Sequence, residues 1–332
     1  MVFAGFSNER NLPGVHGMKG LQHSQRKDHG AVYTLSRNPI RVVTLLSLAF
    51  CLIGALAAAR TQAARSRRFM FMQYTDVNRI VEMSAGGQVL WEHPARSLAV
   101  MFEPLKNGNV IYAFGGKPTG VEEISRDHKV VWSYTADCEQ VLGFERLPNV
   151  NILVWEQGPC RAVEVNPKGE VVHITPLTTN EKPAHRQVRS VHGLPNGHIL
   201  ACHEADATVR EVDADGKVVW EYPGVENVFE AIRLKNGNTL IGSGTSKRVM
   251  EVNKAGKTVW EFGPSDAPEL NMSWITSIQV LKNGNLVVAN FLRGQEGKGA
   301  HAFEITREKK VVWTFSDHNA AKLVTCVKAL GD

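Results

Sequence analysis

Short apolar runs alternate with polar turns from residue 69 to the C-terminus, and no segment between them has the period of a helix. Several runs end at a leucine, and an Asn-Gly pair follows in four of five cases. Asn-Gly favours a tight hairpin because both residues tolerate positive φ, which matches the twist of the flanking strands. The pattern predicts antiparallel β-hairpins and argues against a parallel α/β fold. The five turns are Leu105-Lys-Asn-Gly-Asn109, Leu147-Pro-Asn-Val-Asn151, Leu194-Pro-Asn-Gly-His198, Leu234-Lys-Asn-Gly-Asn238 and Leu281-Lys-Asn-Gly-Asn285.

A glutamate stands nine positions before a tryptophan in five copies of a longer repeat. A sixth copy keeps the spacing but has a histidine in the tryptophan position, at Glu164 and His173. Successive glutamates lie 40 to 53 residues apart, a period typical of propeller blades. Six copies with four strands each predict an all-β, six-bladed β-propeller of antiparallel strands. The five Glu and Trp pairs are Glu82 and Trp91, Glu123 and Trp132, Glu211 and Trp220, Glu251 and Trp260, and Glu304 and Trp313.

The two ends of the repeat region predict how the ring closes. Residues 69–74 occupy the place of a second strand, and no first strand precedes them. The missing strand is found at the other end of the chain, in residues 323–328. Pairing of this C-terminal inner strand with the N-terminal three would complete one blade and remove an open sheet edge. We therefore expect a single propeller domain over residues 68–332.

The N-terminal region has a different character. Residues 1–40 are polar and unpatterned, and they form either a disordered or a misassigned extension. Residues 41–64 begin with a basic flank, continue with an apolar run and end in small residues, the pattern of a secretory signal peptide. A short membrane anchor at residues 42–58 is the alternative. Both interpretations predict an extracytoplasmic propeller, either periplasmic or secreted, which contacts a membrane only if the N-terminal segment is not cleaved.

Composition adds little to this picture. The chain has 38 Lys and Arg against 33 Asp and Glu, a formal net charge of +5. Much of the excess lies next to the apolar N-terminal run, and no basic run recurs in the blades, so we expect no nucleic-acid partner. HxH, HExxH and CxxC spacings are absent, and neither a metal nor another cofactor is expected.

Four of the cysteines lie in the repeat region. Cys138 precedes the innermost strand of a blade whose loop between the second and third strands holds Cys160, so both project toward one face of that blade. An exported protein can oxidise such a pair, and Cys138 and Cys160 are therefore disulfide candidates. Cys202 and Cys326 fall inside strands of different blades and are expected to be separate buried thiols.

The repeated anchors are expected to be structural. The tryptophans lie on outer strands, where each can pack between neighbouring blades. Equivalent glutamates in a ring are far apart, which argues against paired-carboxylate catalysis. We expect them to accept hydrogen bonds from the backbone or from Arg79, Arg161 and Arg248, each of which stands three residues before one of them.

Binding and catalytic residues of such a ring are expected on loops at one end of the channel. Three loops on one face are enlarged, at residues 175–188, 263–274 and 291–300. They and the adjoining residues supply the candidate binding residues His185, Arg186, Arg189, Asp266, Glu269, Trp274, Arg293 and Glu296. Innermost strands add Glu103, Glu145, His192, Glu230 and Gln279 to the channel.

The blade sequences resemble those of PQQ-like and arylsulfotransferase-like propellers. The resemblance rests on Glu-Val-Asp-Ala-Asp-Gly-Lys-Val-Val-Trp-Glu at 211–221 and Leu-Pro-Asn-Gly-His-Ile-Leu at 194–200, and it covers about residues 69–332. In arylsulfate sulfotransferases a channel histidine receives the sulfuryl group. The resemblance thus implies a catalytic role for His192, with Arg189 as its cationic neighbour. This chain has no room for the additional N-terminal β domain of those enzymes.

Two functions follow from these observations. The first is an exported binding or interaction module whose ligand, a carbohydrate, a peptide or a protein, binds at the channel mouth. The second is an arylsulfotransferase-like transferase or hydrolase that uses His192. His192 can also have a purely structural role, as a histidine that is hydrogen-bonded between blades.

Overall fold

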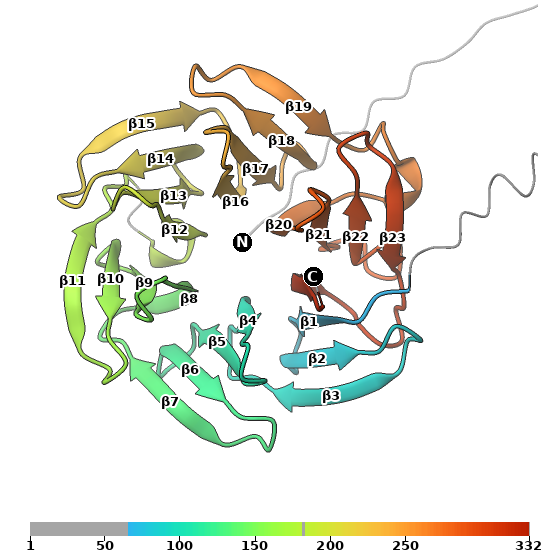
Figure 1. Cartoon of the computed structure of the whole chain (residues 1–332), viewed down its shortest axis with the longest axis horizontal. Coiled ribbons are helices and arrows are strands. Elements are labelled where there is room, and N and C mark those ends of the chain that lie inside the picture. Colours follow the sequence, from blue (N-terminus) through green and yellow to red (C-terminus); the bar gives the residue numbers. More distant parts are fainter. Residues whose placement is uncertain (1–65, 181–182, 332) are drawn as a thin grey trace, which may run out of the picture. The chain divides into compact units, whose positions relative to one another are not determined.

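The computed structural model describes residues 66–180 and 183–331. The predictions for residues 1–64, the extension and the signal peptide or anchor, lie outside the described residues. Within the described ranges, no helix has both the length and the apolar character needed to cross a membrane. What the structure describes is a ring of six four-stranded antiparallel sheets, which confirms the predicted six-bladed β-propeller (Figure 1).

The first three blades contain the N-terminal half of the described chain, and blade 1 also contains the C-terminal strand β24. Strands are numbered in chain order. Blade 1 comprises, from the channel outward, β24 (Val324–Ala329), β1 (Phe69–Gln73), β2 (Arg79–Met83) and β3 (Val89–Pro94). Blade 2 comprises β4 (Phe102–Pro104), β5 (Val110–Phe114), β6 (Gly120–Ile124) and β7 (Val130–Thr135). Blade 3 comprises β8 (Gln140–Arg146), β9 (Ile152–Gln157), β10 (Arg161–Val165) and β11 (Val171–Pro176).

The remaining three blades follow the same plan. Blade 4 comprises β12 (Val191–Gly193), β13 (Ile199–His203), β14 (Thr208–Val212) and β15 (Val218–Pro223). Blade 5 comprises β16 (Val228–Arg233), β17 (Thr239–Ser243), β18 (Arg248–Val252) and β19 (Thr258–Phe262). Blade 6 comprises β20 (Trp274–Val280), β21 (Leu286–Phe291), β22 (Ala302–Ile305) and β23 (Val311–Phe315). Two short 3₁₀ turns, η1 (Ala184–Arg186) and η2 (Pro268–Leu270), lie in enlarged loops before inner strands.

The ring closes as the sequence predicts. β24 pairs antiparallel with β1, so that Phe69 faces Ala329 and Phe71 faces Val327. Backbone hydrogen bonds from Tyr74 to Leu323 and from Leu330 to Arg68, both 3.0 Å, extend the pairing beyond the strands. The two ends of the repeat region therefore complete one blade, and this sheet has no open inner edge.

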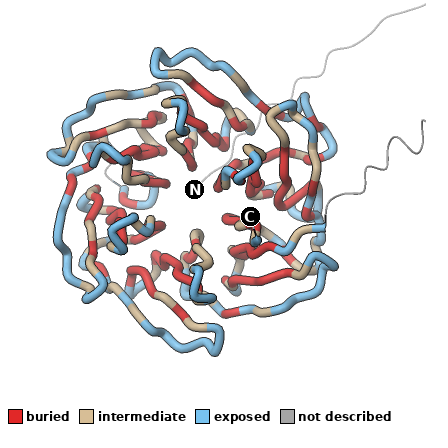
Figure 2. Tube along the Cα trace, viewed as in Figure 1, coloured by how far each residue is buried: buried red, intermediate tan, exposed pale blue. Residues whose placement is uncertain are grey.

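The core lies between blades. Figure 2 shows buried residues concentrated in the inner three strands of each blade, whereas the outer strands are largely exposed. β1, β5, β9, β13 and β17 are buried along their whole length, because both faces of each second strand are covered by neighbouring blades. The six hydrophobic clusters join residues of adjacent blades; one of them packs Phe69 and Phe71 of blade 1 against Trp313 and Phe315 of blade 6.

The Glu and Trp anchors link neighbouring blades. Glu251 and Trp260 face each other on adjacent strands. Arg307, from the next blade, donates to Glu251 and lies 4.4 Å above the Trp260 ring. The Trp260 indole donates a 2.8 Å hydrogen bond to the Arg307 carbonyl. The same arrangement recurs with Arg126 at Trp91. At Trp220 the two roles are divided: Arg233 binds Glu211 and covers the ring, whereas the indole donates to the Lys254 carbonyl.

The predicted packing of Trp between blades thus fits the structure, but the predicted arginine partners are wrong. Arg79, Arg161 and Arg248 bind Glu92, Glu156 and Glu261 instead of the anchor glutamates. The reason is the strand register. An arginine three residues before a glutamate on one strand points to the opposite face of the sheet, whereas the anchor glutamate faces the neighbouring blade.

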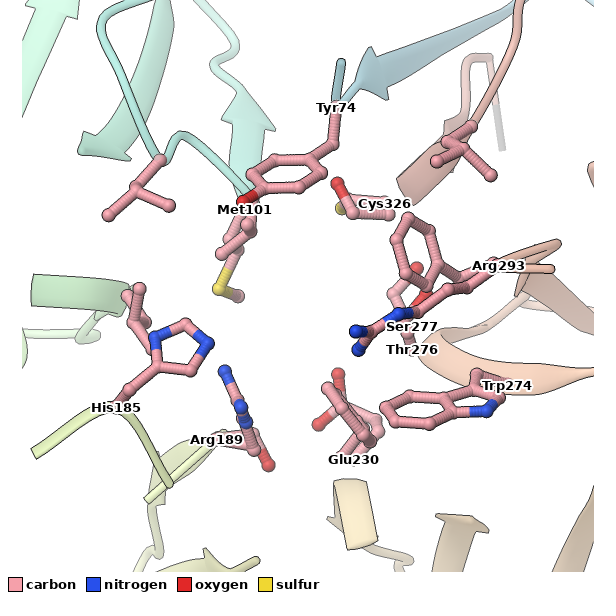
Figure 3. Close-up of a pocket in the computed structure, with 18 of the residues that line it drawn as sticks. Tyr74, Met101, His185, Arg189, Glu230, Trp274, Thr276, Ser277, Arg293 and Cys326 are labelled. Atoms are coloured by element: carbon pink, nitrogen blue, oxygen red, sulfur yellow. The ribbon is translucent and has the colours of Figure 1, made fainter. Parts of the chain in front are cut away.

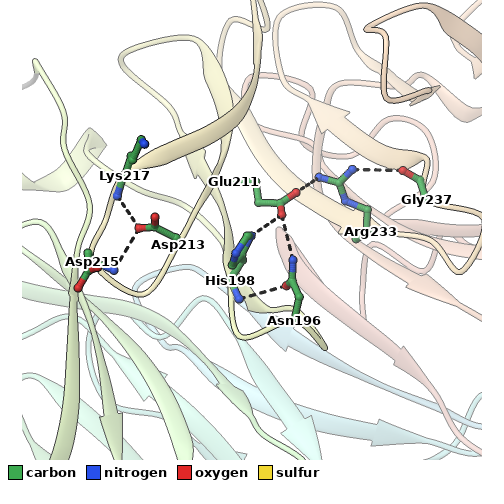
Figure 4. A network of polar contacts seen from close by, with 8 residues as sticks. All are labelled: Asn196, His198, Glu211, Asp213, Asp215, Lys217, Arg233 and Gly237. Atoms are coloured by element: carbon green, nitrogen blue, oxygen red, sulfur yellow. Dashed lines mark hydrogen bonds and ion pairs between the residues drawn. The ribbon is translucent and has the colours of Figure 1, made fainter.

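The hairpin turns use only one left-handed residue. In the turn at Leu194, Gly197 has φ = 81°, while Asn196 accepts a hydrogen bond from the backbone of His198 through its side chain. The expectation that both Asn and Gly adopt positive φ is therefore wrong for this turn. The Asn196 side chain instead contacts the anchor glutamate: Asn196, His198 and Arg233 all donate to Glu211 (Figure 4). The equivalent Asn donates to the anchor glutamate of its own blade in four of the five turns, at Asn107, Asn149, Asn196 and Asn236.

The cysteines do not form the expected disulfide. Cys138 and Cys160 are both free thiols. Cys138 packs in the hydrophobic layer between blades 2 and 3, and Cys160 lies in the layer between blades 3 and 4. Blade 3 itself separates them, so both cysteines belong to one blade but not to one face of it. Cys202 and Cys326 are separate and buried, as predicted.

Candidate functional site

A cavity of about 470 Å³ opens at one end of the central channel, on the face that carries the loops joining second to third strands. A second cavity of about 430 Å³ lies at the opposite end, beside the hairpin turns that follow the inner strands. We call these the upper and the lower cavity. Lys328 lines both of them, so it lies at the middle of the channel.

The repeat explains which side chains line each cavity. The position four residues before the leucine that ends each inner strand contributes to the upper cavity in five of six blades, as Met101, Ser190, Glu230, Ser277 and Cys326. The position two residues before that leucine holds Glu103, Glu145, His192, Ile232, Gln279 and Lys328. Alternate residues of a strand share one face, so both positions point into the channel at successive depths.

Aromatic side chains surround the mouth of the upper cavity. Phe229 and Trp274 pack with ring centroids 5.3 Å apart, and Tyr74 and Phe291 pack at 6.2 Å. Leu98 and Leu142 complete the apolar wall. These residues come from blades 1, 3, 5 and 6 and from the segment between β3 and β4. The cavity size and its mostly apolar lining are those of small-molecule sites in proteins.

Two arginines are directed into this cavity from opposite sides. Figure 3 shows Arg189 and His185 on one side and Arg293 and Trp274 on the other, with Glu230 between them. The Arg293 guanidinium lies 5.6 Å from the Trp274 ring, and Arg189 lies 5.0 Å from the Phe229 ring. Each cation is therefore held against an aromatic surface.

The two arginines differ in their partners. Arg189 shares the buried carboxylate of Glu204 with Arg186, so two positive charges meet one negative charge. Arg293 forms no ion pair or hydrogen bond with any residue in the described part of the chain. The mouth consequently offers an uncompensated guanidinium, a group that binds carboxylate, sulfate and phosphate oxygens in two-point geometry.

His185 is held as a neutral ring at the cavity wall. Its Nδ1 lies 3.0 Å from the amide oxygen of Gln140, and an amide oxygen can only accept, so Nδ1 carries the proton. Burial and the nearby Arg189 guanidinium lower the pKa of His185. The Nε2 lone pair faces the cavity (Figure 3).

His192 occupies a different electrostatic environment. Its Nδ1 lies 3.1 Å from Glu145 and its Nε2 lies 2.8 Å from Glu230. Burial alone would lower the pKa of His192, but the two carboxylates outweigh burial and raise the pKa to about 10. At pH 7 the ring is an imidazolium that donates to a carboxylate on each side, and it bridges the inner strands of three blades.

Glu103 and Gln279 occupy the same repeat position as His192, on the inner strands of blades 2 and 6. Burial raises the pKa of Glu103, and the Lys328 ammonium acts in the opposite direction. Gln279 accepts a 2.7 Å hydrogen bond from the backbone of Ala329 and so joins blade 6 to the closing strand. Both residues line the lower cavity and neither lines the upper one.

The structure thus divides the predicted site residues into three groups. The upper cavity brings together His185, Arg189, Glu230, Trp274, Arg293 and Glu296. The channel centre and the lower cavity hold Glu103, Glu145, His192 and Gln279. Arg186, Asp266 and Glu269 line neither cavity: Arg186 binds Glu204, Asp266 binds Lys309 and caps Gly263, and Glu269 is exposed.

Sequence reasoning missed the cavity residues Tyr74, Phe229, Phe291, Thr325 and Lys328. One of them had a usable signal, because Lys328 stands two residues before Leu330, as His192 stands before Leu194. In the described part of the chain, no group of three or more His, Cys, Asp or Glu side chains is arranged to hold a metal ion.

Comparisons with known proteins support the fold. No protein-family model and no curated protein matches the chain. A protein of unknown function from Bacteroides caccae, solved as a crystal structure, is 23% identical, with a TM-score of 0.72 over 80% of this chain and 100% of its own. A catalytically inactive virginiamycin B lyase from Staphylococcus aureus with quinupristin is 11% identical, with a TM-score of 0.53 over 77% of this chain and 87% of its own.

The WD40 β-propeller domain of Doa1 is 13% identical, with a TM-score of 0.53 over 76% of this chain and 80% of its own. Similarities at these identities establish the β-propeller fold alone. They do not test the resemblance to PQQ-like or arylsulfotransferase-like proteins, which stays a prediction.

Proposed function

We propose that the propeller is a binding module for a small organic anion, and that the ligand occupies the upper cavity. The proposal rests on one observation: Arg293 lines the cavity, stacks on Trp274 and has no acidic partner in the described part of the chain. A free guanidinium on an aromatic wall suits a ligand with an oxyanion and a flat apolar body.

The cavity dimensions narrow the earlier expectation of a carbohydrate, peptide or protein ligand. A volume of about 470 Å³ accommodates a small molecule, and apolar side chains dominate the mouth. A folded protein could contact only the rim, and a long peptide would leave most of its length outside. We propose a compact anion with an aromatic or alicyclic body as the ligand class.

Isothermal titration with 2-naphthoate and its neutral counterpart 2-naphthamide tests this proposal. We expect 2-naphthoate to bind about 10-fold or more tightly, because hydrogen bonds to a charged group contribute roughly 1.5–3 kcal/mol. Arg293→Gln should remove the difference between the two compounds. Lys298→Gln is the matched control, since it removes one positive charge from an exposed position of the same loop. Equal binding of both compounds to the wild type would refute the proposal.

Catalysis through His192 is the alternative, and the geometry does not favour it. A histidine nucleophile needs a free lone pair, but both ring nitrogens of His192 donate to carboxylates and the pKa is about 10. If the cavity is catalytic, the better-placed group is His185, whose neutral Nε2 faces the upper cavity. His185→Gln then abolishes turnover but leaves 2-naphthoate binding in place.

We also propose that the protein acts outside the cytoplasm. This proposal rests on residues 41–64, whose basic flank, apolar run and small-residue exit are typical of a signal peptide. Cell fractionation with N-terminal sequencing of the recovered protein tests it. A new N-terminus at residues 57–64 supports cleavage and export, an intact N-terminus in the membrane fraction supports the anchor, and intact protein in the cytoplasm contradicts both.

A further inference from the structure

The floor of the upper cavity contains polar groups that have no partner in the described residues. Lys328 makes no hydrogen bond or ion pair there, although it lines the cavity. The hydroxyl oxygens of Thr276 and Thr325 are buried and without a hydrogen-bond partner. Glu230 accepts bonds from His192 and from its neighbour Ala231 through Oε1, which leaves Oε2 without a donor. Buried polar groups are normally paired, so this cluster suits a polar ligand group.

The charges at this depth decide what kind of group fits. Three carboxylates, on Glu103, Glu145 and Glu230, and two cations, on His192 and Lys328, interact at the channel centre below the cavity, which carries one net negative charge when all five are ionised. Burial alone would lower the pKa of Lys328, but Cys326 and the same three carboxylates raise it. The lysine therefore stays a charged donor.

We propose that this floor binds a neutral hydroxyl group at the buried end of the ligand. The inference rests on the proposed function above, which places the anionic end at Arg293. It adds the chemical class: a hydroxy acid with an apolar middle, whose carboxylate lies at the mouth and whose hydroxyl lies between Lys328 and Glu230.

Electrostatics and hydrogen bonding both favour a hydroxyl over the alternatives. A second carboxylate would accept from Lys328 but would lie beside Glu230, and like charges at close range are strongly unfavourable. An ammonium would suit Glu230 but would meet Lys328 and the His192 imidazolium. A hydroxyl accepts a hydrogen bond from the Lys328 ammonium and donates a hydrogen bond to Glu230 Oε2. Its second lone pair can accept a further hydrogen bond from the Thr325 hydroxyl.

Three probes of one shape separate these possibilities in isothermal titration at pH 7. They are 6-(hydroxymethyl)-2-naphthoate, 6-ethyl-2-naphthoate, which replaces the hydroxyl with a methyl group, and naphthalene-2,6-dicarboxylate. We expect the hydroxymethyl compound to bind about 10- to 100-fold more tightly than the ethyl compound, because hydrogen bonds to charged groups are the stronger kind and a polar site left unpaired rejects the apolar analogue. The dicarboxylate should bind more weakly than the hydroxymethyl compound.

The outcomes distinguish the anion site at Arg293 from the hydroxyl site at the cavity floor. Equal binding of the hydroxymethyl and ethyl compounds, both weakened by Arg293→Gln, overturns the hydroxyl site and leaves the anion site standing. Tighter binding of the dicarboxylate also overturns the hydroxyl site. Failure of all three compounds to bind overturns both proposals.

Variants assign the effect to the floor. Lys328→Met and Thr325→Val should each reduce the preference for the hydroxymethyl compound at least several-fold, because the hydroxymethyl compound loses a hydrogen-bond partner while the ethyl compound loses no affinity. Lys322→Met is the control, since Lys322 is exposed on the segment that leads into the same strand. Thermal unfolding of each variant shows whether it is folded. A full preference retained in folded Lys328→Met and Thr325→Val proteins overturns the proposal.

Discussion

At the scale of single residues, His192 is a cation that joins blades. It lies between Glu145 and Glu230, and its pKa is about 10. A folded-state pKa above the unfolded value of about 6.5 stabilises the protein fully below pH 6.5, and this stability is lost as the pH rises through about 10. We therefore predict that the stability advantage of the wild type over His192→Gln is largest at pH 6 and disappears near pH 10. Urea unfolding across this range measures it, and an advantage that does not change with pH would exclude a charged His192.

Arg307 supports a second prediction at this scale. Its guanidinium binds Glu251, which is almost fully buried, and covers Trp260, and its own side chain is about one-third exposed. Arg307→Met should lower the free energy of unfolding by about 2 kcal/mol, the sum of a charged hydrogen bond and a partly exposed cation–π contact. Lys310→Met, at an exposed position of the same turn, should change it by less than about 0.5 kcal/mol. Equal effects of the two substitutions would show that the anchor contributes no specific stability.

At the scale of elements, the turn of blade 3 departs from the repeat. Val150 stands where the other hairpin turns have glycine, and its φ is 69°. A β-branched residue in the left-handed region is strained, whereas glycine adopts it freely. Val150→Gly should raise the free energy of unfolding by about 1 kcal/mol. Val172→Gly is the matched control because Val172 is equally exposed, at 53%, but lies within strand β11, and there the same change should destabilise the protein. Destabilisation by both changes would contradict the strain argument.

The elements also show where sequence reasoning is sufficient. The Leu, Asn-Gly, Glu and Trp positions recur at fixed spacing, and this spacing predicts hairpins, blade number and strand count. The arginine partners that three anchor glutamates find in the neighbouring blade could not be predicted this way. They are Arg126, Arg233 and Arg307, and spacing within one blade does not show which residue of the next blade lies opposite.

At the scale of the whole molecule, the ring depends on its last strand. β24 covers β1, whose five residues are all buried. Deletion of residues 323–332 would expose this strand along an open edge, so we predict loss of solubility and of cooperative unfolding. Deletion of residues 331–332 alone, beyond the pairing, should have little effect. A soluble, cooperatively unfolding protein from the longer deletion would contradict the closure.

The site itself could be predicted only in part, because part of its wall depends on how the six blades meet around the channel. Residues on the inner strands follow the repeat, so Glu145, His192 and Glu230 were found, and Lys328 could have been found by the same count. The wall formed by Tyr74, Phe229 and Phe291 depends on how loops and strand ends of different blades meet around the channel. That arrangement has no periodic signal in the sequence.

The central claim is that the upper cavity binds an organic anion through Arg293 and Trp274. A crystal structure of the protein with 2-naphthoate at saturating concentration tests it most directly. We expect the carboxylate to lie against the Arg293 guanidinium and the naphthalene ring against Trp274, with the buried edge of the ligand toward Glu230 and Lys328. An empty upper cavity at saturating ligand, or 2-naphthoate bound only in the lower cavity or on the outer rim of the ring, would contradict this binding mode.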